Sequence, residues 1–338
     1  MRALLSFFAP FFFAVLCTGA RAQVSGAAHE RECARLAPLA YPAAHQPGPA
    51  QQAGLAQCSA TDAYYGNGSP ADYRRARHCA FLAKPDDQPF RMDRGILMML
   101  YANGQGVARD YPLARKAACE AGGAPAEIEA RLAHLGRMAS GEAGARPKID
   151  ICDDITSGYM GGLCAAIASD LRARETGAMF ARLTASWTAP EKAALARLER
   201  AAKSFIEERS GLEVDMTGTA RTAFYIEERD SQWEAFRASL AAFEGGALPR
   251  HTAAEHALAD ARLNTVYRAL MAMPEPVLHD GTIRNEGIRH VQRRWLAYRD
   301  AWVAFGRVKY PQVPALAWNT YFTLQRTRML EELAAWRN

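Results

Sequence analysis

The strongest periodic pattern in the chain lies near its C-terminal end. Large apolar side chains recur there three or four residues apart, at Ile288, Val291, Trp295, Tyr298, Trp302 and Phe305. This spacing places all of them on one stripe of an α-helix over residues 287–306. Two tryptophans and a tyrosine on one stripe carry a large apolar surface that needs a covering partner. We predict that the stripe is helical core, the alternative being a contact with another macromolecule.

The same helical period continues through the rest of the C-terminal half. Thr188 and Thr252 each precede a glutamate by three residues, which is the pattern of a capping box at a helix start. Apolar residues follow both starts at helical spacing, and no stretch alternates as a strand would. The predicted fold class is therefore all-α. We expect a short solenoid-like array of helical hairpins first, and an α-helical bundle after it.

A repeat supports the first part of that expectation. The residues Tyr65-Gly66-Asn67-Gly68 recur as Tyr101-Ala102-Asn103-Gly104, a shift of 36, and Asp72-Tyr73 recurs as Asp110-Tyr111, a shift of 38. A period of this length with a helix, an Asn-Gly turn and a second helix predicts stacked helical hairpins. A concave partner surface is then expected around Tyr73, Arg77, Tyr111 and Arg115.

The segment 101–114 also resembles a known repeat. Its tyrosine, its Gly104-Gln105-Gly106-Val107 and the alanine at 114 are similar to the Sel-like subclass of TPR repeats. The resemblance covers residues 55–137 and implies helical hairpins with a protein partner. Before the repeats, residues 23–54 are rich in Ala, Gln and Pro, so we predict a poorly ordered leader. After them, residues 138–149 read as a linker.

The first 22 residues have the features of an export signal. Arg2 precedes an apolar run over residues 3–17, and Ala20-Arg21-Ala22 offers small residues before a cut ahead of Gln23. We expect a bacterial protein that is periplasmic or secreted, with no membrane span in the mature chain. Removal of Arg2 and Arg21 lowers the formal charge from +5 to +3, which is too small to favour nucleic acid as a partner.

Six cysteines remain after that cut, all in the N-terminal half: Cys33, Cys58, Cys79, Cys119, Cys152 and Cys164. An even number in an oxidising compartment predicts disulfides, although the sequence leaves their connectivity open. Cys152 and Cys164 form the best-supported pair, because a short glycine-rich stretch separates them. Cys58, Cys79 and Cys119 fall on predicted repeat helices, where bridges would staple the hairpins together. No Cys-x-x-Cys occurs, which disfavours a zinc site.

Two blocks in the last third resemble the lysozyme-inhibitor family called LprI-like. The first holds Leu263, Asn264 and Tyr267, and the second holds Gln292, Trp295, Arg299 and Asp300. The match spans residues 251–336, and the region 150–246 resembles a degenerate earlier copy. Family members have paired cysteines in this domain, whereas this chain has none there. We expect packing of Trp302, which follows the second block, to replace the missing disulfide.

The resemblance implies a protein ligand and no reaction, since members of this family bind and inhibit lysozyme. Arg293, Arg299 and Asp300 are the candidate binding residues, the alternative being an intrahelical Arg293–Asp300 face or a contact with the neighbouring helix. Many lysozymes are basic, and the excess of four positive charges from residue 255 onward gives no long-range attraction to them. A periplasmic scaffold or adaptor is the second hypothesis, and a cell-wall-cleaving enzyme the third.

Catalytic chemistry has weak support in the sequence. No Gly-x-Ser-x-Gly or His-Glu-x-x-His occurs, so we predict no catalytic residue, no metal and no cofactor. The third hypothesis rests on neighbouring glutamates: Glu207-Glu208, Glu227-Glu228 and Glu331-Glu332. Carboxylates on solvated helix faces near arginines are more simply explained as ion pairs. Asp153-Asp154 is explained as the acidic N-cap of a helix, and His251 and His256 as surface histidines.

Overall fold

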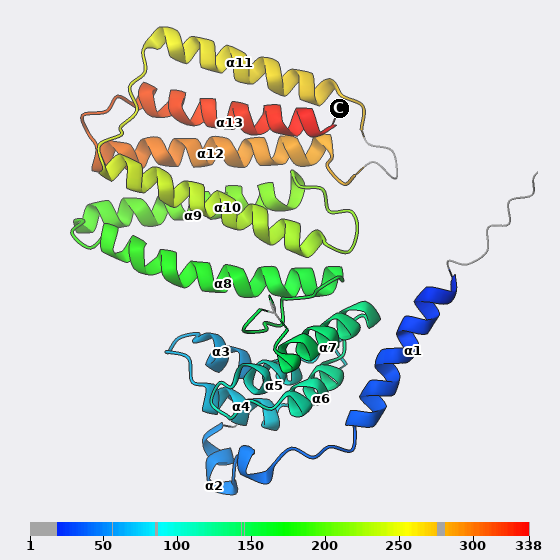
Figure 1. Ribbon diagram of the computed structural model, residues 1–338. Helices are drawn as coiled ribbons and strands as arrows, with labels where there is room; N and C mark the ends of the chain where they lie inside the picture. The colour runs from blue at the N-terminus through cyan, green and yellow to red at the C-terminus, as the bar shows by residue number, and fades with distance from the viewer. Residues whose placement is uncertain are drawn as a thin grey trace, which may run out of the picture. The chain divides into compact units, whose positions relative to one another are not determined.

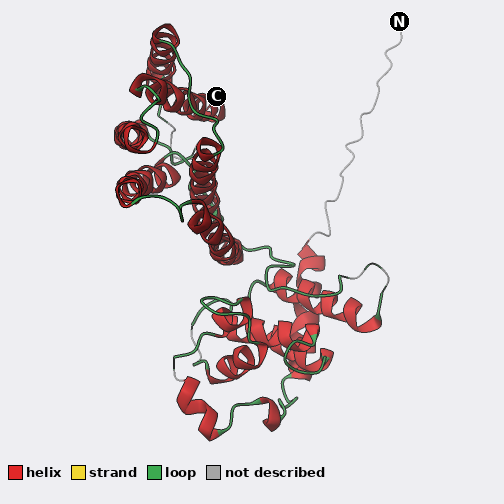
Figure 2. Cartoon of the chain, turned by 90° about the vertical axis from the view of Figure 1, so that its left-hand side faces the viewer, coloured by secondary structure: helices red, strands yellow, loops and turns green. Residues whose placement is uncertain are grey.

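The computed structural model describes residues 19–55, 57–84, 87–142, 144, 146–275 and 281–337. Within these ranges it contains thirteen α-helices, two short 3₁₀ helices and no β-strand. Figure 2 shows helices joined by loops and turns. The all-α prediction is therefore confirmed. Most of the predicted export signal, residues 1–18, lies outside the described residues. The side chain of Trp336, which the sequence places on the last apolar stripe, lies outside them as well.

The chain divides into two compact units, residues 1–156 and 157–338, each of which is described here by itself. The helices of the first unit are α1 (Gly19–Leu36), α2 (Pro49–Gln52), α3 (Ala60–Tyr65), α4 (Tyr73–Leu82), α5 (Met92–Asn103), α6 (Tyr111–Ala121) and α7 (Pro125–Ser140). Helices α3 and α4 form one hairpin and α5 and α6 the next, with α4 packed on α5 and α6 packed on α7. Figure 1 labels these elements.

The two hairpins repeat with a uniform period of 38 residues. The pairs at this spacing are the left-handed glycines Gly66 and Gly104, the left-handed glycines Gly68 and Gly106, and the helix-capping aspartates Asp72 and Asp110. The Asp72 amide donates to the Ala63 carbonyl, and the Asp110 amide donates in the same way to Tyr101. Tyr101 thus corresponds to Ala63 and not to Tyr65. The shift of 36 is wrong by two residues, because the left-handed glycine that ends each helix sets the register.

Two disulfides lie within the first unit. They join Cys33 to Cys119 and Cys58 to Cys79. Cys152 and Cys164 are disulfide-bonded as well, and their pairing with each other stays a prediction. Cys79 and Cys119 lie on repeat helices as expected, whereas Cys58 lies just before the N-cap of α3. The Cys33 bridge ties α1 to α6, so it fastens the leader to the repeats and does not join two hairpins.

The leader is the part of the first unit that differs most from its predicted disorder. It contains α1, α2 and the 3₁₀ turns Ala43–His45 and Ala53–Leu55. Its composition offers little apolar surface, so intrinsic propensity would not order it. The disulfide and a series of polar contacts to α4, α5 and α6 provide the stabilisation that the composition lacks.

The second unit contains α8 (Gly158–Leu183), α9 (Ala189–Leu212), α10 (Arg221–Glu244), α11 (Ala253–Ala272), α12 (Asn285–Lys309) and α13 (Ala315–Arg337). Thr188 and Thr252 form the predicted capping boxes at the starts of α9 and α11. The packing order is α8, α10, α9, α12, α13 and α11, with α11 outermost (Figure 1). Helix α12 contacts α9 more extensively than it contacts α13.

An aromatic cluster fills the interior of this unit, and α12 supplies its centre. All six residues of the predicted stripe are buried. Trp302 is fully buried, and the rings around it are Phe236, Phe243, Phe305, Trp318 and Phe322. Gly306 admits the Trp318 ring so closely that a Cβ atom would lie 2.4 Å from Trp318 Nε1. The expected packing of Trp302 is present, and one core runs from Trp187 to Leu333 across the regions 150–246 and 251–336.

We predict that Trp302→Ala lowers the free energy of unfolding by about 3–5 kcal/mol, because the change leaves a cavity among rings that cannot close it. The measurement is urea unfolding followed by circular dichroism. Leu258→Ala is the control, since the Leu258 side chain on α11 is 72% exposed and its loss should cost at most about 0.5 kcal/mol. Equal losses in both variants would contradict the assigned core.

Candidate functional site

The exposed side of α12 forms a narrow stripe that we call the α12 outer face. Its members are Arg289, Arg293, Leu296, Asp300 and Arg307, all exposed. Their spacing of three, four or seven residues aligns them along one line of the helix. Leu296 is an unusual member, because a large apolar side chain is 39% exposed between charged neighbours. The face combines several donors with one apolar contact.

A buried ion pair between α13 and the end of α9 also holds α12 in position on its buried side. Arg326 on α13 is fully buried, and its two terminal nitrogens donate to the carboxylate of Glu213 at 2.8 and 2.6 Å. Its Nε donates to Gln292 Oε1 on α12 at 2.9 Å. Because Glu213 directly follows α9, one guanidinium joins three helices. Bidentate pairing with a carboxylate and a further hydrogen bond to Gln292 are what allow such a charge to be buried.

Further polar contacts hold α12 to α9 along its length. His290 Nε2 lies 3.2 Å from Glu208 Oε1 near one end, and Lys309 Nζ lies 3.1 Å from Glu191 Oε1 at the other. Beneath them Arg209 pairs with Glu228 on α10, and burial lowers the pKa of the Arg209 guanidinium to about 10. The outer face is therefore presented by a helix that is anchored at both ends and along its buried side.

The three candidate binding residues differ in their availability. Arg299 donates to Asp300 Oδ1 through Nε and Nη2, at 3.1 and 2.9 Å, and its guanidinium lies over the Trp295 ring. These two residues thus pair with each other, whereas the expected alternative paired Arg293 with Asp300. Arg293 is exposed, and the structure records no ion pair for it within the described residues. Of the three, Arg293 is the one free to meet an external carboxylate.

Most of the other residues that carry the family resemblance are structural. Leu263 and Trp295 are buried, and Tyr267 packs against the core. Gln292 accepts the Arg326 hydrogen bond described above. Asn264 is exposed, yet its amide donates to the Asp260 carbonyl oxygen and side chain, both at 2.9 Å. The two blocks therefore encode the way the helices pack more than they encode a binding surface.

Four of the neighbouring glutamates considered for catalysis contact basic side chains. Their recorded partners are Lys203 for Glu207, His290 for Glu208, Arg209 for Glu228 and Arg262 for Glu331. Ion pairing is thus an adequate explanation for Glu207, Glu228 and Glu331. Nowhere in the described part of the chain do three or more His, Cys, Asp or Glu side chains gather as metal ligands. His251 and His256 are half-exposed, and His256 Nδ1 lies 3.1 Å from the Thr320 hydroxyl.

The interpretation of Asp153-Asp154 as a helix cap is wrong. Ser157 is the N-cap of α8, and its hydroxyl accepts from the Met160 amide. Asp153 instead pairs with Arg146, and Asp154 hydrogen-bonds the buried His134 at 2.6 Å. Asp154 has a positive φ of 57°, which breaks the turn before a helix can begin there. A serine three residues later then provides the cap.

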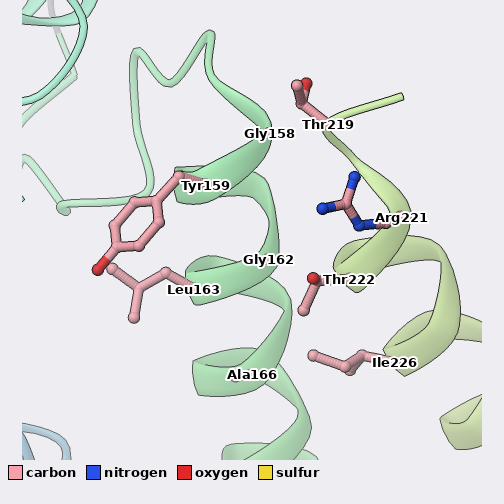
Figure 3. Close-up of a pocket in the computed structure, with 9 residues that line it drawn as sticks. All are labelled: Gly158, Tyr159, Gly162, Leu163, Ala166, Thr219, Arg221, Thr222 and Ile226. Atoms are coloured by element: carbon pink, nitrogen blue, oxygen red, sulfur yellow. The ribbon is translucent and has the colours of Figure 1, made fainter. Parts of the chain in front are cut away.

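One hollow lies between the starts of α8 and α10 and has a volume of about 530 Å³. Figure 3 draws the residues that line it. This hollow reflects close helix packing, since a Cβ atom on Gly158 would lie 2.1 Å from the Thr219 carbonyl oxygen. Figure 3 shows Thr222 and Ile226 facing α8, whereas Tyr159 and Leu163 point away on its other side. These side chains do not converge on one ligand-sized volume.

A comparison with family models decides which part of the chain has known relatives. Residues 247–337 match the model of lysozyme inhibitor LprI. The match covers α11, α12 and α13 and includes the whole α12 outer face. A search of the curated proteins and of the solved structures found no significant match. The predicted Sel-like resemblance of the repeats has no support from a family model. Among the described helices none is long and apolar enough to cross a membrane.

Sequence reasoning missed the Arg326–Glu213 pair. The two residues are 113 positions apart, and no local pattern connects them. One signal was present, because Arg326 stands between Phe322 and Leu330 on the apolar stripe of α13. A charged residue in such a stripe indicates a buried partner, although it does not identify which one.

We predict that Glu213→Ala lowers the free energy of unfolding by about 3–5 kcal/mol, because Arg326 is then buried without its carboxylate. Adding Arg326→Met should recover part of this loss. Glu331→Ala breaks the exposed Arg262 pair and serves as the control, with an expected cost of at most about 1 kcal/mol. Thermal and urea unfolding of the three variants measure these differences. A double variant no more stable than Glu213→Ala would argue against the pairing.

Proposed function

We propose that this chain is an exported binding protein that inhibits lysozyme or a related cell-wall hydrolase through the α12 outer face. The match of residues 247–337 to lysozyme inhibitor LprI carries the proposal. The disulfides of the first unit fit an oxidising compartment outside the cytoplasm. On this proposal the protein acts by occupying its partner and catalyses no reaction of its own.

The chemistry of the target supports a role for Arg293. Glycoside hydrolases such as lysozyme use a pair of carboxyl groups that flank the bond to be cleaved. A guanidinium can donate two parallel hydrogen bonds to one carboxylate, which makes arginine well suited to such a cleft. Arg293 is exposed and has no ion-pair partner within the described residues, while Leu296 beside it offers an apolar contact.

The anchoring of α12 favours the same face. An interface gains affinity when its contact residues are held in place before binding, because less conformational entropy is lost. The aromatic core and the Arg326–Glu213 pair hold α12 on its buried side. Short-range contacts of this kind do not depend on net charge. The basic character of many lysozymes therefore slows the approach without preventing a close fit.

The test is clearance of a cell-wall suspension by lysozyme in the presence of the full exported chain. We expect a micromolar excess to slow clearance, and Arg293→Glu to raise the concentration needed at least tenfold, since a like charge would then face the catalytic carboxylates. Arg197→Glu is the matched control, because Arg197 is an exposed arginine on α9 outside this face. It should inhibit as the unmodified chain does.

Two outcomes would count against the proposal. If the unmodified chain leaves clearance unchanged, inhibition of that lysozyme is excluded. If Arg293→Glu and Arg197→Glu lose inhibition equally while both stay folded, the α12 outer face is not the contact surface. Circular dichroism of each variant separates the second outcome from unfolding.

A scaffold function is the second candidate, and the hairpins of the first unit favour it. Stacked helical hairpins present long surfaces that bind other proteins. Unlike inhibition, this function would survive Arg293→Glu and would be lost when the surface of α4, α5 and α6 is altered. The two functions therefore separate by the unit in which a substitution acts.

A further inference from the structure

Residues 29–48 form a strap that lies across the repeat hairpins. Most strap side chains are exposed, and only a few turn inward, among them Cys33, Tyr41 and His45. The Glu32 carboxylate pairs with Arg115 on α6. Lys116 Nζ donates to the Ala37 carbonyl at 2.9 Å. The strap thus covers part of the surface that the repeat pattern assigns to an external partner.

The Tyr41 side chain has well-defined neighbours on three repeat helices, and these neighbours form what we call the Tyr41 pocket. Its walls are Phe81 on α4, Arg94 and Tyr101 on α5, and Lys116 and Glu120 on α6. The ring centroid of Tyr41 lies 5.3 Å from that of Phe81 and 5.9 Å from that of Tyr101. Its hydroxyl donates to Glu120 Oε2 at 2.8 Å. Burial and the nearby Glu120 carboxylate raise the pKa of the Tyr41 hydroxyl, so it stays a donor.

The Tyr41 pocket does not depend on the strap for its shape. Lys116 Nζ lies 2.7 Å from Glu120 Oε1, and Arg94 Nε lies 3.6 Å from Glu120 Oε2. The first pair lies within α6 and the second joins α5 to α6, and neither involves a strap atom. Arg77 Nε on α4 also donates to the His45 carbonyl at 2.9 Å, so a second cationic side chain of the hairpins contacts the strap backbone. A pocket built by the hairpins and filled by a mostly exposed segment has the form of a binding site with an occupant.

The Cys33–Cys119 disulfide fastens the strap in this position. Both cysteines are half-exposed, so a thiolate can approach this disulfide. Cys58 of the other described bridge is half-exposed as well, whereas its partner Cys79 is 2% exposed. Without the Cys33–Cys119 bond, the strap is held by the Tyr41 and His45 rings, two buried side chains, ion pairs and a few hydrogen bonds.

We propose that the Tyr41 pocket is a docking site for a segment of another exported protein that resembles the strap, that the strap occupies it in cis, and that the Cys33–Cys119 disulfide keeps it closed. The partner segment carries a glutamate or aspartate nine residues before a tyrosine, as Glu32 precedes Tyr41. Arg115 meets the acid, and the Tyr41 pocket takes the ring and its hydroxyl. The site lies in the first unit, so its failure would leave the inhibitor proposal on α12 untouched.

Opening requires an external dithiol, such as a dithiol oxidoreductase of the envelope. Its thiolate attacks one sulfur of the Cys33–Cys119 bond, forms a mixed disulfide and releases the other cysteine as a thiolate, which takes up a proton. The second thiol of the reductant then attacks the mixed disulfide and frees the first cysteine. The chain ends with two thiols, and the reductant ends as its own disulfide.

The test uses the full exported chain and a fluorescein-labelled synthetic peptide of residues 29–48 with serine in place of Cys33. The variant Cys33→Ser/Cys119→Ser/Tyr41→Ala unfastens the strap and empties the pocket. We expect it to bind the peptide at least tenfold more tightly than the oxidised unmodified chain, measured by fluorescence anisotropy. A peptide with Tyr41→Ala should not bind, and one with Glu32→Arg should bind at least tenfold more weakly.

A second variant covers the case in which the triple variant does not fold. Tyr41→Ala with the disulfide intact empties only the ring position, and N-acetyltyrosinamide is the probe. Calorimetry should record saturable binding to this variant, none to the unmodified chain, and none with N-acetylalaninamide. The proposal is overturned if the folded triple variant ignores the peptide or binds its alanine version equally well. It is also overturned if folded Tyr41→Ala fails to bind the probe.

Discussion

The packing of Trp302 against the surrounding rings is the interaction on which the second unit depends. Phe243 from α10, Trp318 and Phe322 from α13 and Phe305 from its own helix all meet this one indole. Aromatic pairs of this kind add edge and face attractions to the burial of a large apolar area. Because α12 supplies the central ring, the orientation of its solvent side follows from this packing. The charged outer face is a consequence of the aromatic inner one.

The polar contacts around that cluster restrict how the helices can be arranged. A charge pair buried between α9 and α13 contributes little net stability, since both groups lose their hydration. Yet any sliding of α13 along α12 would separate Arg326 from both Glu213 and Gln292, which is far more costly. The pair therefore selects one register among packings that the aromatic rings alone would tolerate. Gln292 belongs to the block that resembles the inhibitor family, so this register is part of what that block encodes.

Local patterns in the sequence predicted the elements well. The capping boxes at Thr188 and Thr252, and the stripe from Ile288 to Phe305, depend on residues at most a few turns apart. The helices and their buried sides could therefore be read directly. Candidate site residues were predicted less completely. Exposure on a helix was evident for Arg293, but its expected alternative partner was Asp300, and Asp300 pairs with Arg299 instead.

Features that depend on distant residues could not be read in this way. Three contacts join positions far apart in the chain. They are the Arg326–Glu213 ion pair, the hydrogen bond from Tyr41 to Glu120 and the Cys33–Cys119 disulfide. The predicted repeat register was wrong for another reason. The alignment matched identical residues at Tyr65 and Tyr101, whereas the backbone repeats from one left-handed glycine at a helix end to the next. Composition predicted a disordered leader because it reflects only the apolar surface that a segment can bury by itself. It does not include the contacts that neighbouring helices provide.

Helix α12 packs more extensively against α9 than against any other helix. This packing affects how the match of residues 247–337 to the family model is interpreted. The residues matched by the family model begin after α10, so they omit the helix against which α12 packs most extensively. Isolated from α9, the segment would expose Phe305, Tyr298 and their neighbours to water. In this protein the inhibitor-like region is not a portable module. A fragment designed to keep this packing would have to begin upstream and include α9.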